Sequence, residues 1–574
     1  MISLLFLAVV IGVVVWLVAG SRRHGAAPDR GVHTLRRFVQ YTFLLAALFT
    51  AGTGASRLVI TALPGETIAE RRVTEVALGV ALTIVAVPVW LLLWRQVSRH
   101  LVVDAEERAS TGWALYLVIA TTVSLVVAFV QLLEIGRWAI GAQPYAPEPI
   151  AFAAVFLVLW VAHTWLLMHP QWRPTGRPAP LAMLAGSVVG LVGVAVGGGG
   201  VLAAGLRALY ELIAGPLLVA APLDVTLGTS VILAVLGAMT WWWHWWRQGL
   251  TAERTGLWHA YVLLIGVLGG LLTAVSAAGT ALHSVVQWWV GEPWTTTAAA
   301  HFDVLPTAIA AGFVGAWVWW YHRRVLDARP SPVRTEPERV YGYLVSAVGL
   351  VAAAAGVTVA IMAAIQALTP GALAVFDARG RNTLAAAITL LVVGLPLWVT
   401  FWHRLQLEVA RNGPAERRSV TRRSYLMLLF GAAGLTAAVS VGVVLYVVIR
   451  DLLEQQLAVT VLHDLRAAIG LIITAGAIAT YHVFVYRADR LAVPAEEVRH
   501  PRDVLLVSSD GRDLASAVAA GTGARVHGLH RLDVAPHAID VDRVTAAILA
   551  SPHERVLVTI DEQDRVVVIP YDRG

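Results

Sequence analysis

The sequence predicts an all-α polytopic membrane protein with about 13 transmembrane helices, followed by a small C-terminal cytoplasmic α/β domain. Of its 574 residues, 58% are hydrophobic and 14% are charged, and the charged share is far below that of an average soluble domain. Apolar stretches long enough to cross a bilayer recur from the first residue to about residue 487. The net charge of +6 comes from arginines in short loops between these stretches, so it indicates membrane topology and predicts no nucleic-acid partner.

Two residue types are missing from the chain, and their absence excludes several chemistries. Without cysteine there are no disulfides, no thiolate catalysis and no cysteine-bound metals. Without lysine there is no Schiff-base chemistry and no P-loop lysine. Because no motif forms a catalytic constellation, we predict that the protein is not an enzyme and binds no cofactor.

The first apolar segment, "MISLLFLAVVIGVVVWLVAG" (1–20), predicts a membrane helix. Its basic cluster "SRRHG" follows the apolar run, whereas a signal peptide carries its basic residues before that run. The same hydropathy criterion predicts twelve further spans, near residues 36–61, 73–94, 113–138, 149–169, 181–213, 224–246, 256–290, 301–321, 340–368, 381–402, 424–452 and 463–486.

Alternate loops differ in arginine content, and this difference predicts the orientation. Loops such as "WRQVSRHLVVDAEERAS" (94–110) are rich in arginine, whereas loops such as "GAQPYAPEP" (141–149) contain none. Arginine in short loops marks the cytoplasmic side. We therefore expect a bacterial plasma (inner) membrane protein with its N-terminus outside and its C-terminus in the cytoplasm.

The helices that run inward end in a repeated pattern of aromatic residues followed by a cation. Aromatic residues four apart lie on one helix face, and at the headgroup level such residues anchor a helix to the membrane interface. The predicted interface anchors are Trp90, Trp94, Arg95, Trp165, Trp242, Trp246, Arg247, Trp317, Tyr321, Trp398, Trp402, Arg404, Tyr486 and Arg487.

The repeated endings divide the chain into three parallel four-helix units. The first unit covers residues 34–173, the second 178–328 and the third 334–490. An N-terminal helix and basic linker (1–33) precede them, and the α/β domain (498–574) follows.

The starts and ends of these helices resemble a known family. The segment "RVYGYLV" (339–345) and the ending "VVGLPLWVTFWHR" (392–404) are similar to the bacterial multi-pass membrane family called domain of unknown function 5671. The third unit matches best, the first well and the second least. The resemblance implies a bacterial multi-pass membrane protein built from four-helix units, and it brings no assigned activity.

A run of four glycines, "VGGGGV" (196–201), lies within one long predicted span. Four glycines destabilise a helix interior by roughly 1 kcal/mol each relative to alanine, so the run can break the helix. A break there can present backbone groups to a solute, as in many transporters, but close helix packing, or a bend where the segment emerges outside, is the favoured explanation. The candidate solute-binding glycines are Gly197, Gly198, Gly199 and Gly200.

Ionisable residues near the outer helix ends are the other candidate solute ligands. Glu134 and Arg137 are three apart, and Arg207 and Glu211 are four apart, which places each pair on one helix face. They either line an outer vestibule for a polar solute or form local ion pairs on a solvated rim.

Histidines near the cytoplasmic helix ends suggest a third possibility. Two of them on facing helices could ligate haem or a metal, although no H-x-x-x-H or E-x-x-H spacing accompanies them. The histidines are His163, His244, His259, His322, His403 and His482.

The tail alternates segments of strand and helix character, as expected for a small α/β domain. Strands are predicted at "DVLLVSS", "RVLVTIDE" and "RVVVIPY", and helices at "DLASAVAAG" and "VDRVTAAILAS". The "SSDGRD" segment (508–513) lacks a nucleotide-binding motif, so a regulatory or protein-docking role is favoured over nucleotide binding.

Three functions follow from these features. We expect a non-catalytic membrane scaffold or accessory subunit, with the lipid bilayer and a protein bound by the tail domain as partners. The alternatives are a transporter or channel for a small polar solute, which uses the outer vestibule and the glycine-broken helix, and a haem- or metal-binding redox protein.

Overall fold

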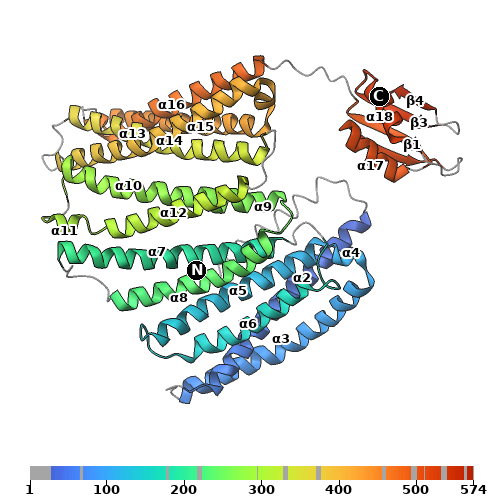
Figure 1. The fold of residues 1–574 in the computed structure, drawn as a ribbon, viewed down its shortest axis with the longest axis horizontal. Helices are drawn as coiled ribbons and strands as arrows, with labels where there is room; N and C mark the ends of the chain where they lie inside the picture. Colours follow the sequence, from blue (N-terminus) through green and yellow to red (C-terminus); the bar gives the residue numbers. More distant parts are fainter. Residues whose placement is uncertain are drawn as a thin grey trace. The chain divides into compact units, whose positions relative to one another are not determined.

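The computed structural model describes most of the chain beyond residue 27 (Figure 1). The described residues are 28–64, 69–175, 180–215, 223–293, 295–327, 334–369, 377–455, 460–492, 501–509, 511–531, 539–560 and 565–572. The predicted first helix lies outside them. The chain forms two compact bodies, one of Met1–Leu407 with Gly431–Ala479, and the other of Glu408–Phe430 with Thr480–Gly574.

The first four-helix unit contains four long helices and one short one. They are α2 (Pro28–Ala62), α3 (Ala69–Val103), the short α4 (Ala105–Arg108), α5 (Thr111–Ala139) and α6 (Pro147–Met168). Two starts have a local cause. The side chain of Ser110 caps α5 by accepting a hydrogen bond from the Trp113 amide, and Pro147 occupies the first turn of α6, where no intrahelical donor is needed.

The second unit contains two stretches of π-helix. Its elements are α7 (Leu181–Ala214), α8 (Leu223–Trp241), η1 (Trp242–Gly249), α9 (Gly256–Ala260), η2 (Tyr261–Gly269), α10 (Gly270–Trp289), α11 (Ala298–His301) and α12 (Leu305–Asp327). The π-helical η1 continues α8, and η2 joins α9 to α10, so each forms part of one membrane-length helix.

The third unit consists of four long helices. They are α13 (Glu336–Leu368), α14 (Asp377–Arg418), α15 (Val420–Leu453) and α16 (Thr460–Ala492). Twelve helices in the described part of the chain are long and apolar enough to cross a membrane, and they correspond to the twelve spans predicted after the first. The prediction of a polytopic α-helical membrane protein is therefore confirmed.

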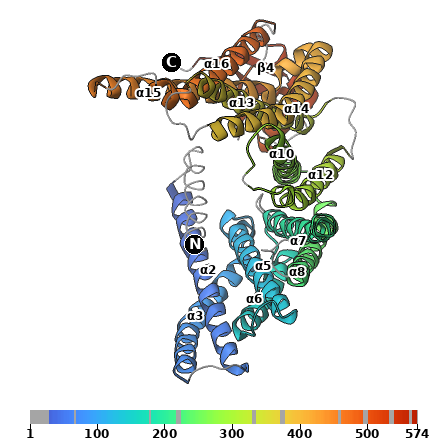
Figure 2. The ribbon, with the colours of Figure 1, turned by 90° about the vertical axis from the view of Figure 1, so that its left-hand side faces the viewer.

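The units pack in series within the larger body. In the first unit, α2 contacts α3, α5 and α6; in the second, α7 contacts α8 and α12, and α12 contacts α10 and η2. Helix α5 then packs against α7 and α8 of the next unit, as Figure 2 shows, and η2 packs against α13 of the third. The third helix of each of the first two units therefore contacts the first helix of its successor.

Helix α7 runs without interruption through the four glycines, so the helix break considered for a solute site is absent. A Cβ on Gly197 would overlap the backbone nitrogen of Ala234 on α8, and one on Gly200 would overlap the Ser230 hydroxyl. The glycines thus let two helices approach closely, which is a common way for helices to associate in lipid. This contact, which the sequence analysis favoured together with a bend, offsets the low helix propensity of the run.

The C-terminal domain is a four-stranded sheet with two helices. Its elements are β1 (Asp503–Ser508), α17 (Gly511–Thr522), β2 (Arg525–His530), α18 (Val541–Leu549), β3 (Arg555–Ile560) and β4 (Val566–Pro570). The strand order is β2-β1-β3-β4, with β4 antiparallel to β3 and the other neighbours parallel. The predicted elements are present, and β2 is an additional strand that the sequence analysis missed.

We predict that Gly197→Ala destabilises the protein and that Gly198→Ala does not. The new methyl group at residue 197 meets the α8 backbone, and overpacking of this kind costs about 1–3 kcal/mol. No atom lies within 4 Å of the Cβ position on Gly198, so alanine there raises helix propensity at no packing cost. Thermal unfolding in detergent, followed by tryptophan fluorescence, measures both. Equal melting temperatures for the two variants would contradict the packing role of Gly197.

Candidate functional site at the arginine-rich helix ends

The third helix of every four-helix unit starts with the same sequence pattern, [ST]-x-x-[WR]-x-x-Y. The first residue caps the helix: Ser110, Thr255 and Ser419 each accept a hydrogen bond from the amide three residues later. The fourth residue is nearly or fully buried in each unit and is Trp113, Trp258 or Arg422. The pattern therefore determines where the third helix begins and which of its side chains is buried.

The tyrosine that ends this pattern packs against a buried histidine on the fourth helix of the same unit. The pairs are Tyr116–His163, Tyr261–His322 and Tyr425–His482, with ring centroids 5.7, 5.7 and 6.2 Å apart. One aromatic–imidazole pair thus recurs in each unit, and aligning the three units by the pattern would have revealed it from the sequence.

Hydrogen bonds determine how two of these histidines are held. In both, Nδ1 donates to the carbonyl four residues earlier, Leu159 for His163 and Val318 for His322, at 2.7 and 2.8 Å. This leaves Nε2 as an acceptor. In His163 it accepts the Tyr116 hydroxyl at 3.0 Å, whereas the buried Nε2 of His322 has no hydrogen-bond partner among the described residues.

Both π-helical stretches converge on His322. Trp245 of η1 lies 5.9 Å from the imidazole between ring centroids, and Tyr261 begins η2. A Cβ on Gly266 of η2 would overlap the imidazole ring. Since π-helical segments often occur at functional sites, this enclosed cluster distinguishes the second unit from the first.

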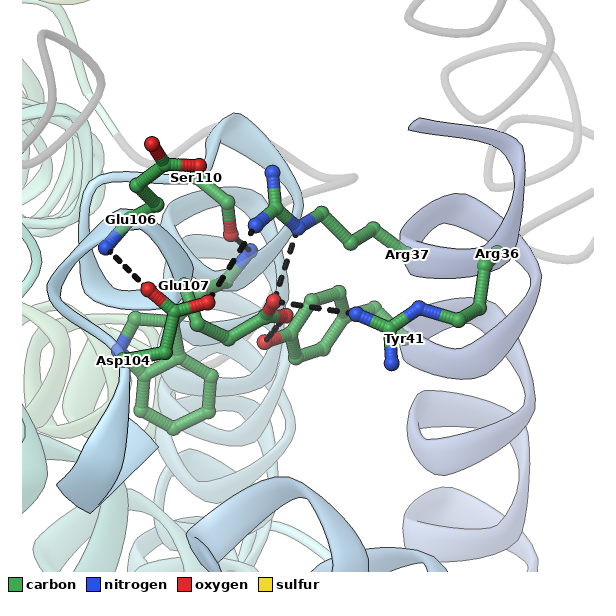
Figure 3. Close-up of polar contacts among 8 residues, drawn as sticks. Arg36, Arg37, Tyr41, Asp104, Glu106, Glu107 and Ser110 are labelled. Carbon is green, nitrogen blue, oxygen red and sulfur yellow. Dashed lines mark hydrogen bonds and ion pairs between the residues drawn. The ribbon is translucent and has the colours of Figure 1, made fainter. Parts of the chain in front are cut away.

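The first unit holds a buried carboxylate at the arginine-rich end, Glu107, whose side chain is 3% exposed (Figure 3). Three donors from α2 surround it. Arg37 Nε lies 2.8 Å and Arg36 Nη2 3.4 Å from its Oε2, and the Tyr41 hydroxyl donates to its Oε1 at 2.8 Å. A buried carboxylate is tolerated when it is paired and hydrogen-bonded in this way.

The short helix α4 places Glu107 in this position. Asp104 caps α4 by accepting a hydrogen bond from the Glu106 amide, and Ser110 ends the same loop by capping α5. Glu106 is exposed, whereas Glu107 points inward. In the third unit, Glu416 likewise stands three residues before the capping serine, and it is also buried.

The sequence analysis missed Glu107 because "DAEER" resembles a solvated acidic loop. The partners of Glu107 lie about 70 residues earlier in the chain, so local pattern gives no sign of burial. The spacing of a glutamate three residues before the capping serine in two units was the available signal.

The ionisable residues predicted to bind a solute bond to one another. Arg137 Nη1 lies 3.2 Å from Glu134 Oε1, and Arg207 Nε lies 3.3 Å from Glu211 Oε1. Each pair lies on one helix and is about one-third exposed. Of the four candidate glycines, Gly197 and Gly200 pack against α8. A Cβ on Gly199 would lie 3.7 Å from Val314 Cγ2, and no described atom lies within 4 Å of one on Gly198.

Most of the predicted interface anchors lie at least partly at the surface. Trp165, Trp242, Trp246 and Trp317 are exposed, as are the cations Arg95, Arg247, Arg404 and Arg487. Trp90, Trp94, Tyr321, Trp398 and Tyr486 are partly buried. Trp402 differs, because its side chain is 6% exposed and lies inside the protein.

Chemically, the cluster around Glu107 is suited to holding helices together. Its carboxylate already accepts hydrogen bonds from three donors, which leaves little capacity for a substrate or proton transfer. The histidines proposed for haem are divided among the units, with His163 in the first, His244, His259 and His322 in the second, and His403 and His482 in the third.

These features define a polytopic α-helical membrane protein that repeats a four-helix unit. Residues 51–143 and 339–477 match the family described as "Domain of unknown function (DUF5671)". The two regions lie in the first and third units, so the predicted resemblance is confirmed there. No curated protein and no solved structure matches the chain.

We predict that Glu107→Gln destabilises the protein. The substitution removes the negative charge that neutralises Arg36 and Arg37, whose side chains are 40% and 21% exposed. Solvent therefore screens part of the loss, and we expect about 1–3 kcal/mol. Thermal unfolding in detergent checks this. Glu106→Gln is the control, since Glu106 is exposed one residue away. Similar unfolding of both variants would mean that the ion pairs contribute nothing.

We also predict that His163→Leu costs more stability than His322→Leu. Each loses the bond to its own helix, but only His163→Leu leaves a buried tyrosine hydroxyl without its acceptor. The difference should be about 1–2 kcal/mol. Comparing melting temperatures of the two variants tests it. A larger loss for His322→Leu would indicate that Nε2 of His322 binds a group from outside the chain.

Proposed function

We propose that the protein is a non-catalytic scaffold or accessory subunit of the bacterial plasma membrane. In this proposal the arginine-rich loops and the C-terminal domain lie in the cytoplasm, as the arginine distribution favours. The helices anchor the chain, and the cytoplasmic parts hold another protein at the membrane.

The observation that carries the proposal is that the candidate solute ligands are engaged with each other. Glu134 bonds Arg137, and Arg207 bonds Glu211, each within one helix. A solute that bound here would have to break these ion pairs. Because each pair is partly exposed to solvent, the new contacts would be screened by water and would bring little affinity in return. The continuous α7 also lacks the freed backbone groups that broken transporter helices offer.

The architecture supports a scaffold in a second way. At the arginine-rich end of the first unit, the buried charge of Glu107 is satisfied by α2. A cluster saturated in this way holds one arrangement of the helices and needs no bound molecule to complete it. Such rigidity is expected of a scaffold protein. An alternating-access transporter, by contrast, must move its helices apart during each cycle.

We expect native mass spectrometry of the protein, extracted with its surrounding lipid from its own membrane, to show another protein at fixed stoichiometry. A scaffold that binds a partner retains it during gentle extraction. A chain that carries only a stoichiometric small molecule, in repeated preparations, would overturn the proposal and favour a transporter or cofactor-binding protein.

Proteoliposome swelling in sugars, amino acids and salts provides the matching test of transport. The scaffold proposal predicts equal swelling for the parent chain, Glu211→Gln and the control Glu253→Gln, which changes an exposed loop carboxylate. Swelling that falls several-fold with Glu211→Gln, while Glu253→Gln stays normal, would support an outer solute site instead.

A further inference from the structure

In the described part of the C-terminal domain, helices cover one face of the sheet only. Val504, Leu506, Val556 and Val558 alternate along β1 and β3 and are fully buried against α17 and α18. Because successive side chains of a strand point to opposite faces, the residues between them lie on the other face. Sheets built mainly from parallel strands are normally covered on both faces, so this face lacks its expected cover.

The uncovered face is apolar in its centre. Strand pairing places two rows of side chains side by side across the sheet, one from His527 to Ile569 and one from Leu529 to Val567. Leu529, Val567 and Ile569 are 49%, 46% and 44% exposed. The apolar members of the rows are Leu505, Val507, Leu529, Leu557, Val567 and Ile569. We call these six residues the open face.

Charges of both signs border the open face. Asp503 and Arg555 are paired across β1 and β3 at the start of these strands. Asp503 lies 3.5 Å from His527 Nε2, and Arg555 lies 3.1 Å from Asp572. A border of one sign would repel its own copy, whereas this mixed border permits a face-to-face pair.

We propose that the open face binds the open face of a second copy of this chain. Two sheets that stack about 10 Å apart bury their facing side chains as a shared core. A two-fold axis makes the contact self-complementary, as in most homodimers. The proposal goes beyond the scaffold function, which concerns a different protein partner.

The size of the face is sufficient for such a contact. Four strands spaced about 4.8 Å apart and roughly 18 Å long cover about 350 Å². Because side chains project from the sheet, the accessible surface is larger, and each copy buries on the order of 500 Å². The pair then buries about 1,000 Å² in total, which is the lower limit for a specific interface. Confinement of both copies to one membrane raises their effective concentration and favours the dimer further.

Cross-linking of the full-length protein in membranes tests this proposal, because the natural chain contains no cysteine. Leu557→Cys lies in the middle of the open face, near its counterpart across a two-fold axis. Ala546→Cys, exposed on α18 of the helical layer, is the control. With a short bis-maleimide cross-linker, which can span sheets stacked about 10 Å apart where a direct disulfide cannot, Leu557→Cys should give a band at twice the 61.5 kDa chain mass, at least fivefold stronger than the control.

A charge on the open face should prevent this cross-link. Adding Ile569→Asp to Leu557→Cys should weaken the dimer band at least fivefold, whereas adding Ala546→Asp should leave it unchanged. If Leu557→Cys lowers the protease resistance of the domain, Val567→Cys on the same face replaces it. Monomer only, equal bands from both faces, or a band of another mass would each overturn the proposal. A different protein partner found by mass spectrometry, without this dimer, would leave the scaffold function standing.

Discussion

The membrane part of this protein depends on close backbone contact between paired helices. A Cβ on Gly190 or Gly349 would overlap the backbone of a tryptophan on the second helix of the same unit, Trp241 or Trp398. In a bilayer, apolar side chains gain little free energy by moving from lipid into a helix contact, because lipid tails are equally apolar. Tight van der Waals packing is therefore a main source of helix association. These glycines thus set the spacing between the first and second helices of their units.

Once helices lie this close, any charge between them must be neutralised within the protein. In the first unit, Glu107 accepts hydrogen bonds from donors on α2. In the third, Arg422 Nε and Nη2 donate to the carboxylate oxygens of Asp489 at 2.5 and 3.2 Å. The burial of an unpaired ion costs far more than either pair gains. The ion pairs therefore act mainly by excluding other arrangements of these helices.

Hydropathy and loop arginines predict the twelve later spans because a bilayer imposes length and polarity on each segment separately. The strand "RVHGLH" (525–530) escaped prediction because arginine, glycine and two histidines hide its alternation, and it forms through pairing with β1. For the glycine run, the sequence shows the propensity cost of Gly197 and does not show its contact with Ala234, so it left a helix break open beside close packing. The burial of Glu107 depends on α2, which local patterns do not bring near, so only the comparison of repeated units offered a signal for it.

The second unit shows that the shared geometry does not require a shared polar chemistry. The residue three positions before its capping threonine is Ala252, where the other units have Glu107 and Glu416. Ala252 packs into an aromatic core, and the Arg254 guanidinium lies 4.9 Å above the Trp258 ring. A cation over an indole face and apolar packing thus replace the ion pairs that hold this loop in the first unit. The second unit keeps the capping residue, Thr255, and the tyrosine, Tyr261. The repeat therefore preserves the position of the third helix, while the polar contacts around its start differ from unit to unit.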